Sequence, residues 1–186
     1  GTLSGTQEGE AQKRSGGKKA ATRPQKRGHM RSQELRKQAP ELDPLRLGTG
    51  WKREDLAKPQ ILIESSFGDS HPGSVHLLEL AEKARAGTAL EGGFGARYFC
   101  TDICDGEAQG HDGMNYSLPS RDMMANMIEI HACATPFDGA IYIAGCDKSM
   151  PAHLMAAGRI NIPCVVLPGG VMNAGPDLLT LEQIGA

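Results

Sequence analysis

A strand, a polar turn and the start of a helix follow one another in residues 138–154, and this stretch constrains the fold most. A short apolar run rich in β-branched residues lies between two glycines, which predicts a buried strand. Ser149 and Pro151 then predict a helix start, with Ser149 as the N-cap and proline in the first turn. Three chemically potent side chains fill the turn between strand and helix: Cys146, Asp147 and Lys148.

The same alternation of strand and helix extends over residues 60–167. We expect three helices, at residues 74–86, 119–134 and 150–159, and four strands, at residues 60–64, 96–103, 138–145 and 163–167. Strands that alternate with helices indicate βαβ units, a parallel sheet and right-handed crossovers. The predicted fold class is therefore α/β, and the polar turns at the carboxyl ends of its strands are the expected place for a ligand.

Charge divides the chain unevenly although its net charge is only −2. Residues 1–40 contain 10 of the 20 Lys and Arg but only three acidic residues, with almost no apolar content, and we expect a disordered basic tail. Residues 41–59 are interpreted as a linker or surface segment, and residues 60–186 as a partial α/β domain that stops in mid-fold. Because no aromatic residues alternate with the basic ones, a solvated tail is favoured over contact with nucleic acid or a membrane surface.

The five cysteines indicate a reducing compartment. Their number is odd, and three of them, Cys100, Cys133 and Cys164, lie in or beside apolar runs where we expect core residues. Free thiols of this kind argue against a disulfide framework and favour a cytoplasmic protein. No apolar run approaches the roughly 20 residues that a membrane-spanning helix needs, so no membrane association is expected.

A second polar cluster mirrors the first. Cys104 and Asp105 follow the predicted strand 96–103, just as Cys146 and Asp147 follow the next one. The carboxyl ends of parallel strands share one edge of a sheet, so we expect Asp105, Cys146, Asp147 and Lys148 to converge on one pocket. Thiolates select zinc or iron–sulfur clusters, whereas carboxylates suit Mg²⁺ or Mn²⁺, and a pocket with both ligand types can hold both kinds of metal.

Two long motifs and one loop carry a resemblance to a known family. Residues 105–121 contain Asp-Gly followed by Gly-x-x-Gly-Met-x-Tyr-Ser-Leu-Pro-Ser-Arg, and residues 145–151 read Gly-Cys-Asp-Lys-x-Met-Pro. Residues 58–77 add Lys-Pro, Ser-Phe, Pro-Gly and Val-His-Leu in order. Together they resemble the dihydroxy-acid and phosphogluconate dehydratase family over residues 58–184. The resemblance implies the three-layer, parallel-sheet N-terminal domain of that family, truncated in this chain.

The resemblance implies an activity and its cofactors. Family members remove water from a 2,3-dihydroxy acid, a small molecule, to give a 2-keto acid, using an iron–sulfur cluster ([2Fe–2S] or [4Fe–4S]) and Mg²⁺. Cys146 matches a cluster ligand, and Asp105 and Asp147 match ligands of Mg²⁺. Lys148 matches a catalytic lysine that is carbamylated and ligates the same ion. Cys104 is an additional candidate cluster ligand, because some sugar-acid members have a cysteine there.

Departures from the family pattern decide between its subgroups. The first loop, residues 65–73, lacks the cysteine of many sugar-acid members, and residues 75–77 keep Val-His-Leu. Both features favour dihydroxy-acid dehydratase of branched-chain amino acid biosynthesis, whereas Cys104 favours a sugar-acid (aldonate or phosphogluconate) dehydratase. The later cysteine motif, the glutamate ligand of Mg²⁺ and the serine base belong to regions beyond residue 186. We therefore expect the piece alone to be inactive, and the full-length enzyme to be a homodimer or homotetramer.

Three other interpretations are weaker. A truncated, non-catalytic binding module tethered to nucleic acid by the basic tail would not need Lys148 or the two aspartates. A nucleotide-binding Rossmann domain would need Gly-x-Gly-x-x-Gly after a strand, and none is present. His71 and His76 suggest a zinc pair, but no further ligand spacing supports one, and His76 is better interpreted as ordering the first loop or lining the pocket.

Overall fold

A parallel four-stranded sheet forms the centre of the molecule. The computed structural model describes residues 30–135 and 137–184. The strand order is β2-β1-β3-β4, and every neighbouring pair is parallel. All four strands therefore end at the same edge of the sheet. Their bounds are β1 (Gln60–Ser65), β2 (Phe94–Phe99), β3 (Gly139–Ala144) and β4 (Cys164–Pro168).

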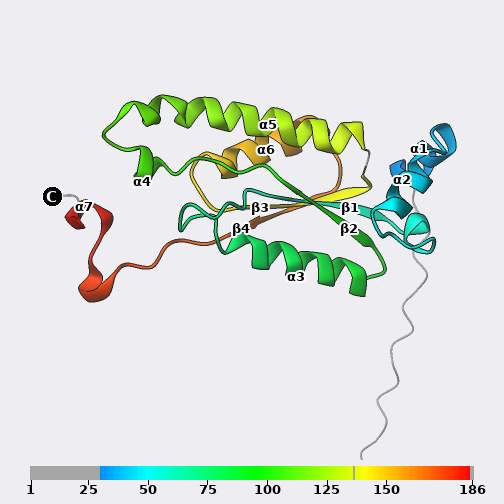
Figure 1. Cartoon of the computed structure of the whole chain (residues 1–186), viewed down its shortest axis with the longest axis horizontal. Helices are drawn as coiled ribbons and strands as arrows, with labels where there is room; N and C mark the ends of the chain where they lie inside the picture. The colour runs from blue at the N-terminus through cyan, green and yellow to red at the C-terminus, as the bar shows by residue number, and fades with distance from the viewer. Residues whose placement is uncertain (1–29, 136, 185–186) are drawn as a thin grey trace, which may run out of the picture.

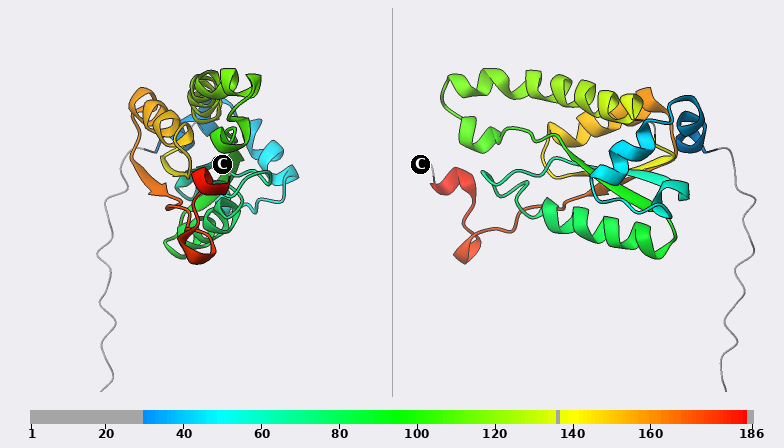
Figure 2. Two further views of the ribbon diagram at one scale, coloured as in Figure 1. Left: turned by 90° about the vertical axis from the view of Figure 1, so that its left-hand side faces the viewer. Right: turned by 45° about the vertical axis from the view of Figure 1, so that its right-hand side comes forward.

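Helices cover the sheet from both sides. Helix α3 (Leu77–Leu90) lies on one face, and α5 (Ser117–Ala134) and α6 (Ser149–Ile160) lie together on the other (Figure 1). Seen along its length, the molecule shows the sheet between these two helical layers (Figure 2, left). This is the three-layer α/β arrangement, and the predicted fold class is confirmed.

Alternating side chains of the central strands build a separate core on each face. Leu62 points toward α5 and α6, where it clusters with Ile128 and Tyr142. Its neighbour Ile63 points to the opposite face and clusters with Leu77 at the start of α3. All of these side chains are fully buried. Burying an aliphatic side chain of this size contributes about 1.5–3 kcal/mol, so the two cores hold the helices against the sheet.

Residues 31–57 form three short helices before β1, although residues 1–40 were expected to be disordered. These are α1 (Arg31–Gln38), α2 (Leu42–Gly48) and the 3-10 helix η1 (Asp55–Ala57). The backbone N–H and hydroxyl of Ser32 donate to the carboxylate of Asp138, at 3.0 and 2.6 Å, and this contact ties α1 to the start of β3. The prediction of a disordered tail is therefore wrong for residues 31–38, while residues 1–29 lie outside the described part.

Several element boundaries differ from the sequence expectation. Helix α3 continues through Gly87 and ends before Gly92, whose φ of 81° suits glycine. Strand β2 starts two residues earlier than expected and ends at Phe99. Ser149 is the first residue of α6 rather than its N-cap, which is Lys148, and its hydroxyl accepts the N–H of Cys146 instead of an N–H of the helix.

Among the described residues, two of the three cysteines that were expected in the core, Cys133 and Cys164, are exposed. Cys164 and Val165 lie on β4, an edge strand with no described element over its α3-side face, and Val165 is 61% exposed. An apolar groove of about 710 Å³ runs between β4 and α3. Cys133 is exposed on α5, and Met127, on the same helix, is 40% exposed. The core prediction is therefore wrong for Cys133 and Cys164, whereas Cys100 packs against the core.

The remaining short elements lie toward the carboxyl edge of the sheet, away from α1 and α2 (Figure 2, right). Among the residues described, no helix is both long and apolar enough to cross a lipid bilayer. The short elements are α4 (Asp105–Ala108), η2 (Asp112–Tyr116), η3 (Pro176–Leu178) and α7 (Leu181–Ile184).

Candidate metal centre

A pocket of about 530 Å³ opens at the carboxyl edge of the sheet. The loops after all four strands contribute to it, which is the position where open α/β sheets bind their ligands. The first and last of these loops are joined by the ring of His76, which hydrogen-bonds through Nε2 to the carbonyl oxygen of Gly169 at 2.9 Å. The side chains with ligand chemistry that line this pocket are His71, His76, Cys104 and Cys146.

Close backbone packing holds the turn after β3 in place. A side chain at Gly145 would overlap the carbonyl oxygen of Gly73, so only glycine fits where the turn leaves the strand. The N–H of Cys146 donates to the Ser149 hydroxyl at 3.0 Å, and that hydroxyl lies 3.2 Å from the carbonyl oxygen of Cys146. Ser149 is fully buried, so the turn is fixed to the start of α6.

Lys148 lies between two carboxylates. Its Nζ donates to Asp105 Oδ2 at 2.7 Å and to both carboxylate oxygens of Asp147, at 3.0 and 2.7 Å. Asp105 follows β2 and Asp147 follows β3, so the sheet brings these predicted Mg²⁺ ligands together from two different loops. The hydrogen bond to Asp105, and to a smaller extent the one to Asp147, raises the pKa of Lys148. The hydrogen bond from Lys148 in turn lowers the pKa of Asp105.

A further hydrogen bond orients Asp105. Ser117, the first residue of α5, donates its hydroxyl to Asp105 Oδ1 at 2.7 Å. The two oxygens of Asp105 therefore have different partners, Ser117 on one and Lys148 on the other. Side-chain exposure differs within the pair that contacts Lys148, at 32% for Asp105 and 73% for Asp147. The more accessible Asp147 leaves one side of the cluster open to solvent or to a ligand.

Cys146 is half-buried and its thiol holds its proton strongly. Burial, with a smaller contribution from nearby Asp102, raises the pKa of Cys146 to about 11. Without a cation, Cys146 is therefore a protonated, unreactive thiol at neutral pH. A metal ion that binds the sulfur displaces this proton. Cys104 lines the same pocket from the loop after β2.

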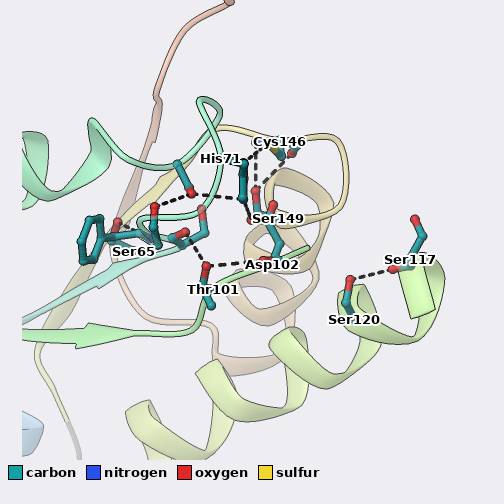
Figure 3. A network of polar contacts seen from close by, with 12 residues as sticks. Ser65, His71, Thr101, Asp102, Ser117, Ser120, Cys146 and Ser149 are labelled. Atoms are coloured by element: carbon teal, nitrogen blue, oxygen red, sulfur yellow. Dashed lines mark hydrogen bonds and ion pairs between the residues drawn. The ribbon is translucent and has the colours of Figure 1, made fainter. Parts of the chain in front are cut away.

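A buried histidine lies beside Cys146 and was not predicted as a ligand. His71 Nε2 is 3.1 Å from Asp102 Oδ1, and His71 Nδ1 is 3.9 Å from Cys146 Sγ (Figure 3). One ligand atom from each of these three residues lies within 4.8 Å of the others. Burial raises the pKa of Asp102. The three residues come from three loops, so no local spacing in the sequence could have indicated the group.

The donor atoms fit two kinds of metal at neighbouring positions. Sulfur and imidazole nitrogen, from Cys146, Cys104 and His71, suit iron or zinc. Carboxylate oxygens from Asp105 and Asp147 suit Mg²⁺. An ammonium group already lies between those two carboxylates, which shows that the position favours a positive charge. The structure thus places all of the predicted ligands around one edge of the sheet, and their metal-binding roles remain predictions.

Comparison with known proteins agrees with the motifs. The family described as dihydroxy-acid/6-phosphogluconate dehydratase N-terminal matches residues 58–185. A dihydroxy-acid dehydratase of Methanosarcina barkeri is 44% identical over 167 residues, which is 84% of this chain and 30% of the relative.

Two further relatives, also named dihydroxy-acid dehydratase, show the same pattern. The protein of Oleidesulfovibrio alaskensis is 41% identical over 73% of this chain and 26% of its own length, and that of Dehalococcoides mccartyi is 45% identical over 68% and 23%. The chain thus spans less than a third of the curated relatives it matches. It belongs to the dihydroxy-acid/6-phosphogluconate dehydratase family, whose N-terminal region it matches at residues 58–185.

Proposed function

We propose that this chain is the N-terminal part of a hydro-lyase that converts a 2,3-dihydroxy acid into a 2-keto acid. The substrate proposed first is the dihydroxy acid of branched-chain amino acid biosynthesis, because the relatives reported above carry the name dihydroxy-acid dehydratase. The proposed cofactors are an iron–sulfur cluster at Cys146 and Mg²⁺ at Asp105, Asp147 and Lys148. The proposed location is the cytoplasm, and the proposed assembly of the full-length enzyme is a homodimer or homotetramer.

The observation that carries the proposal is the position of Lys148 between Asp105 and Asp147. A binding module has no need to bring a lysine and two carboxylates together beside a half-buried cysteine. The dehydration does need such a set, because the C2 proton is very weakly acidic and negative charge develops at the carboxylate end of the substrate. When bound, Mg²⁺ supplies charge stabilisation there, and the cluster supplies a Lewis acid for the 3-hydroxyl.

The residues of this chain would bind and orient Mg²⁺ and the substrate, while residues beyond position 186 would remove the C2 proton. Asp105 and Asp147 offer carboxylate oxygens on one side of the pocket, and Ser117 holds Asp105 in orientation. Lys148 gains oxygen ligands when its amine reacts with CO₂, since the ammonium releases two protons, keeps one N–H and becomes a carbamate with a negative charge. The proton lost from C2 and the hydroxide lost from C3 leave as water, and the resulting enol becomes the ketone.

A sugar-acid dehydratase is the second candidate, and Cys104 favours it. Cys104 lines the same pocket as Cys146, from the neighbouring loop. Two cysteines on one pocket fit a cluster better than one does. Cys104 bears on the choice of substrate only because some sugar-acid members of the family have a cysteine at the matching position. Substrate assays must therefore separate the two candidates.

The test uses the protein extended past residue 186, purified anaerobically with iron, sulfide and Mg²⁺. Turnover of 2,3-dihydroxy-3-methylbutanoate, with none of xylonate or gluconate, supports the first candidate, and the reverse result supports the second. Lys148→Met should abolish turnover. Lys83→Met is the matched control, because Lys83 is 69% exposed and its ion pair among the described residues is with Glu79, across one turn of α3. Full activity in Lys148→Met, or no turnover of any of the three acids, would reject the proposal.

A further inference from the structure

His71 is buried and packed against polar groups, although it lies in a loop. Its side chain is 3% exposed and that of its partner Asp102 is 0% exposed. The loop that carries His71 passes so close to Cys146 that a side chain at Gly73 would overlap the sulfur atom. The imidazole of His71 and the thiol of Cys146 are thus held next to each other by residues from the loops after β1, β2 and β3.

The hydrogen bonds of His71 define which ring nitrogen is free. Nε2 lies 3.1 Å from Asp102 Oδ1 and 3.1 Å from Ser74 Oγ. Ser74 has already donated its only hydroxyl hydrogen to the carbonyl oxygen of Gly68, at 2.8 Å, so toward the ring it can only accept. Nε2 therefore carries the hydrogen in the neutral imidazole, and Nδ1 presents a lone pair toward Cys146.

The spacing of the two donor atoms suits one metal ion. Nδ1 and Sγ are 3.9 Å apart. Metal–nitrogen and metal–sulfur bonds of about 2.0–2.1 and 2.3 Å at a tetrahedral angle place two such ligands about 3.6 Å apart. A small rotation of the Cys146 side chain closes the difference. A histidine that ligates a metal through one nitrogen usually donates its other N–H to a carboxylate, which is the arrangement that Asp102 provides here.

We infer that His71 ligates, through Nδ1, the metal centre that Cys146 ligates through Sγ, and that Asp102 is the positioning residue for the ring. Mixed sulfur and imidazole ligation of iron is chemically established in [2Fe–2S] centres. The inference rests on the proposed function, because it concerns the centre at Cys146. It adds a nitrogen ligand from the loop after β1 to a site that the sequence motifs describe through sulfur and carboxylates alone.

Cobalt(II) binding to the 186-residue chain tests the ligand set without an activity assay. Cobalt bound to a thiolate gives a sulfur-to-metal charge-transfer band. Because Cys104 lines the same pocket, the comparison uses a Cys104→Ser background, in which the band should be present with Cys146 and absent in Cys146→Ser. His71→Gln should weaken cobalt binding at least tenfold. His111→Gln is the matched control, because His111 is exposed, does not line the pocket and hydrogen-bonds to the carbonyl oxygen of Glu107; it should leave the affinity unchanged.

Two more measurements separate a ligand from a structural residue. In protein with ¹⁵N-labelled histidine and a reconstituted, reduced cluster, pulsed electron paramagnetic resonance should show strong coupling to one histidine nitrogen, lost in His71→Gln. Asp102→Asn should lower the cobalt affinity about 10- to 100-fold, the usual effect of losing such a partner, while the band at saturation keeps its shape.

The outcomes distinguish the two proposals. If the Cys104→Ser chain shows no thiolate band, or if the band persists when Cys146→Ser is added, Cys146 is not a ligand and the proposed cofactor fails. If the band depends on Cys146 but His71→Gln binds cobalt as tightly as the unmodified chain, only the role of His71 is rejected. A cluster without strong histidine nitrogen coupling also rejects that role and leaves the proposed function intact.

Discussion

His153 should make the stability of this domain sensitive to mild acid. The residue lies on α6, one turn after the Cys146–Lys148 turn, and its side chain is fully buried. Nδ1–H donates to the carbonyl oxygen of Ser149 at 2.7 Å, and the ring packs edge-on against Tyr142 with ring centroids 5.8 Å apart. Among the described residues nothing hydrogen-bonds to Nε2. A proton on that nitrogen would be a buried, unpaired charge.

The magnitude follows from the pKa. Burial lowers the pKa of His153 from 6.5 to about 4. Above pH 6.5 the imidazole is neutral in both the folded and the unfolded chain, and the contribution of His153 to stability is fully present. As the pH falls from 6.5 to about 4, His153 binds a proton in the unfolded chain but not in the folded chain. At about 1.4 kcal/mol per pH unit, the free energy of unfolding should fall by about 3 kcal/mol over this window.

The assay is urea unfolding at about pH 7 and about pH 4, in the unmodified chain and in His153→Leu. Leucine is close in size and does not titrate, so acid effects from other groups appear in both proteins and cancel in the difference. The unmodified chain should lose about 3 kcal/mol more than the variant between the two pH values.

Equal pH dependence in the unmodified chain and His153→Leu would refute this reasoning. So would a nuclear magnetic resonance titration in which His153 takes up its proton near pH 6.5. Either result would mean that the ring reaches water or a proton acceptor in solution. If the prediction holds, α6 loosens on acidification, and the turn that carries Cys146 and Lys148 loses its support.

Three further predictions concern the backbone and the site. Gly145→Ala should cost about 1–3 kcal/mol in urea unfolding, because the methyl group would overlap the carbonyl oxygen of Gly73. Gly158→Ala, within helix α6, has open space and a helical backbone and should gain about 0.5–1 kcal/mol. Asp138→Ala removes the acceptor that anchors α1 and should cost about 1–3 kcal/mol, with hydrogen exchange accelerating first in α1; exchange that stays slow there would contradict the anchor. Carbamylation of Lys148 should need Mg²⁺. The two aspartates raise the pKa of the lysine and keep it as an unreactive ammonium until Mg²⁺ binds the aspartates in its place. A carbamate signal from ¹³C-bicarbonate without Mg²⁺ would contradict this coupling.

Hydrophobic periodicity was sufficient to predict the layers of the fold. Alternating side chains such as Leu62 and Ile63 serve opposite faces of the sheet, and a strand buried on both faces therefore reads as a continuous apolar run. Strands separated by helices must be parallel, so their carboxyl ends share an edge. That reasoning placed Asp105 and Lys148 near each other although 43 residues separate them, and the structure joins them at 2.7 Å.

Contacts between distant loops could not be predicted in this way. Asp102 and His71 lie in loops without a repeating pattern, and only the packing of two strand ends brings them together. Likewise, composition predicted disorder where Ser32 is held by Asp138, 106 residues away. The amino-acid sequence by itself determined the order of strands and helices and the chemistry placed at each strand end, because these depend on local periodicity. Only the tertiary structure decided which loop residues meet beside Cys146, because loop geometry depends on contacts between segments far apart in the chain.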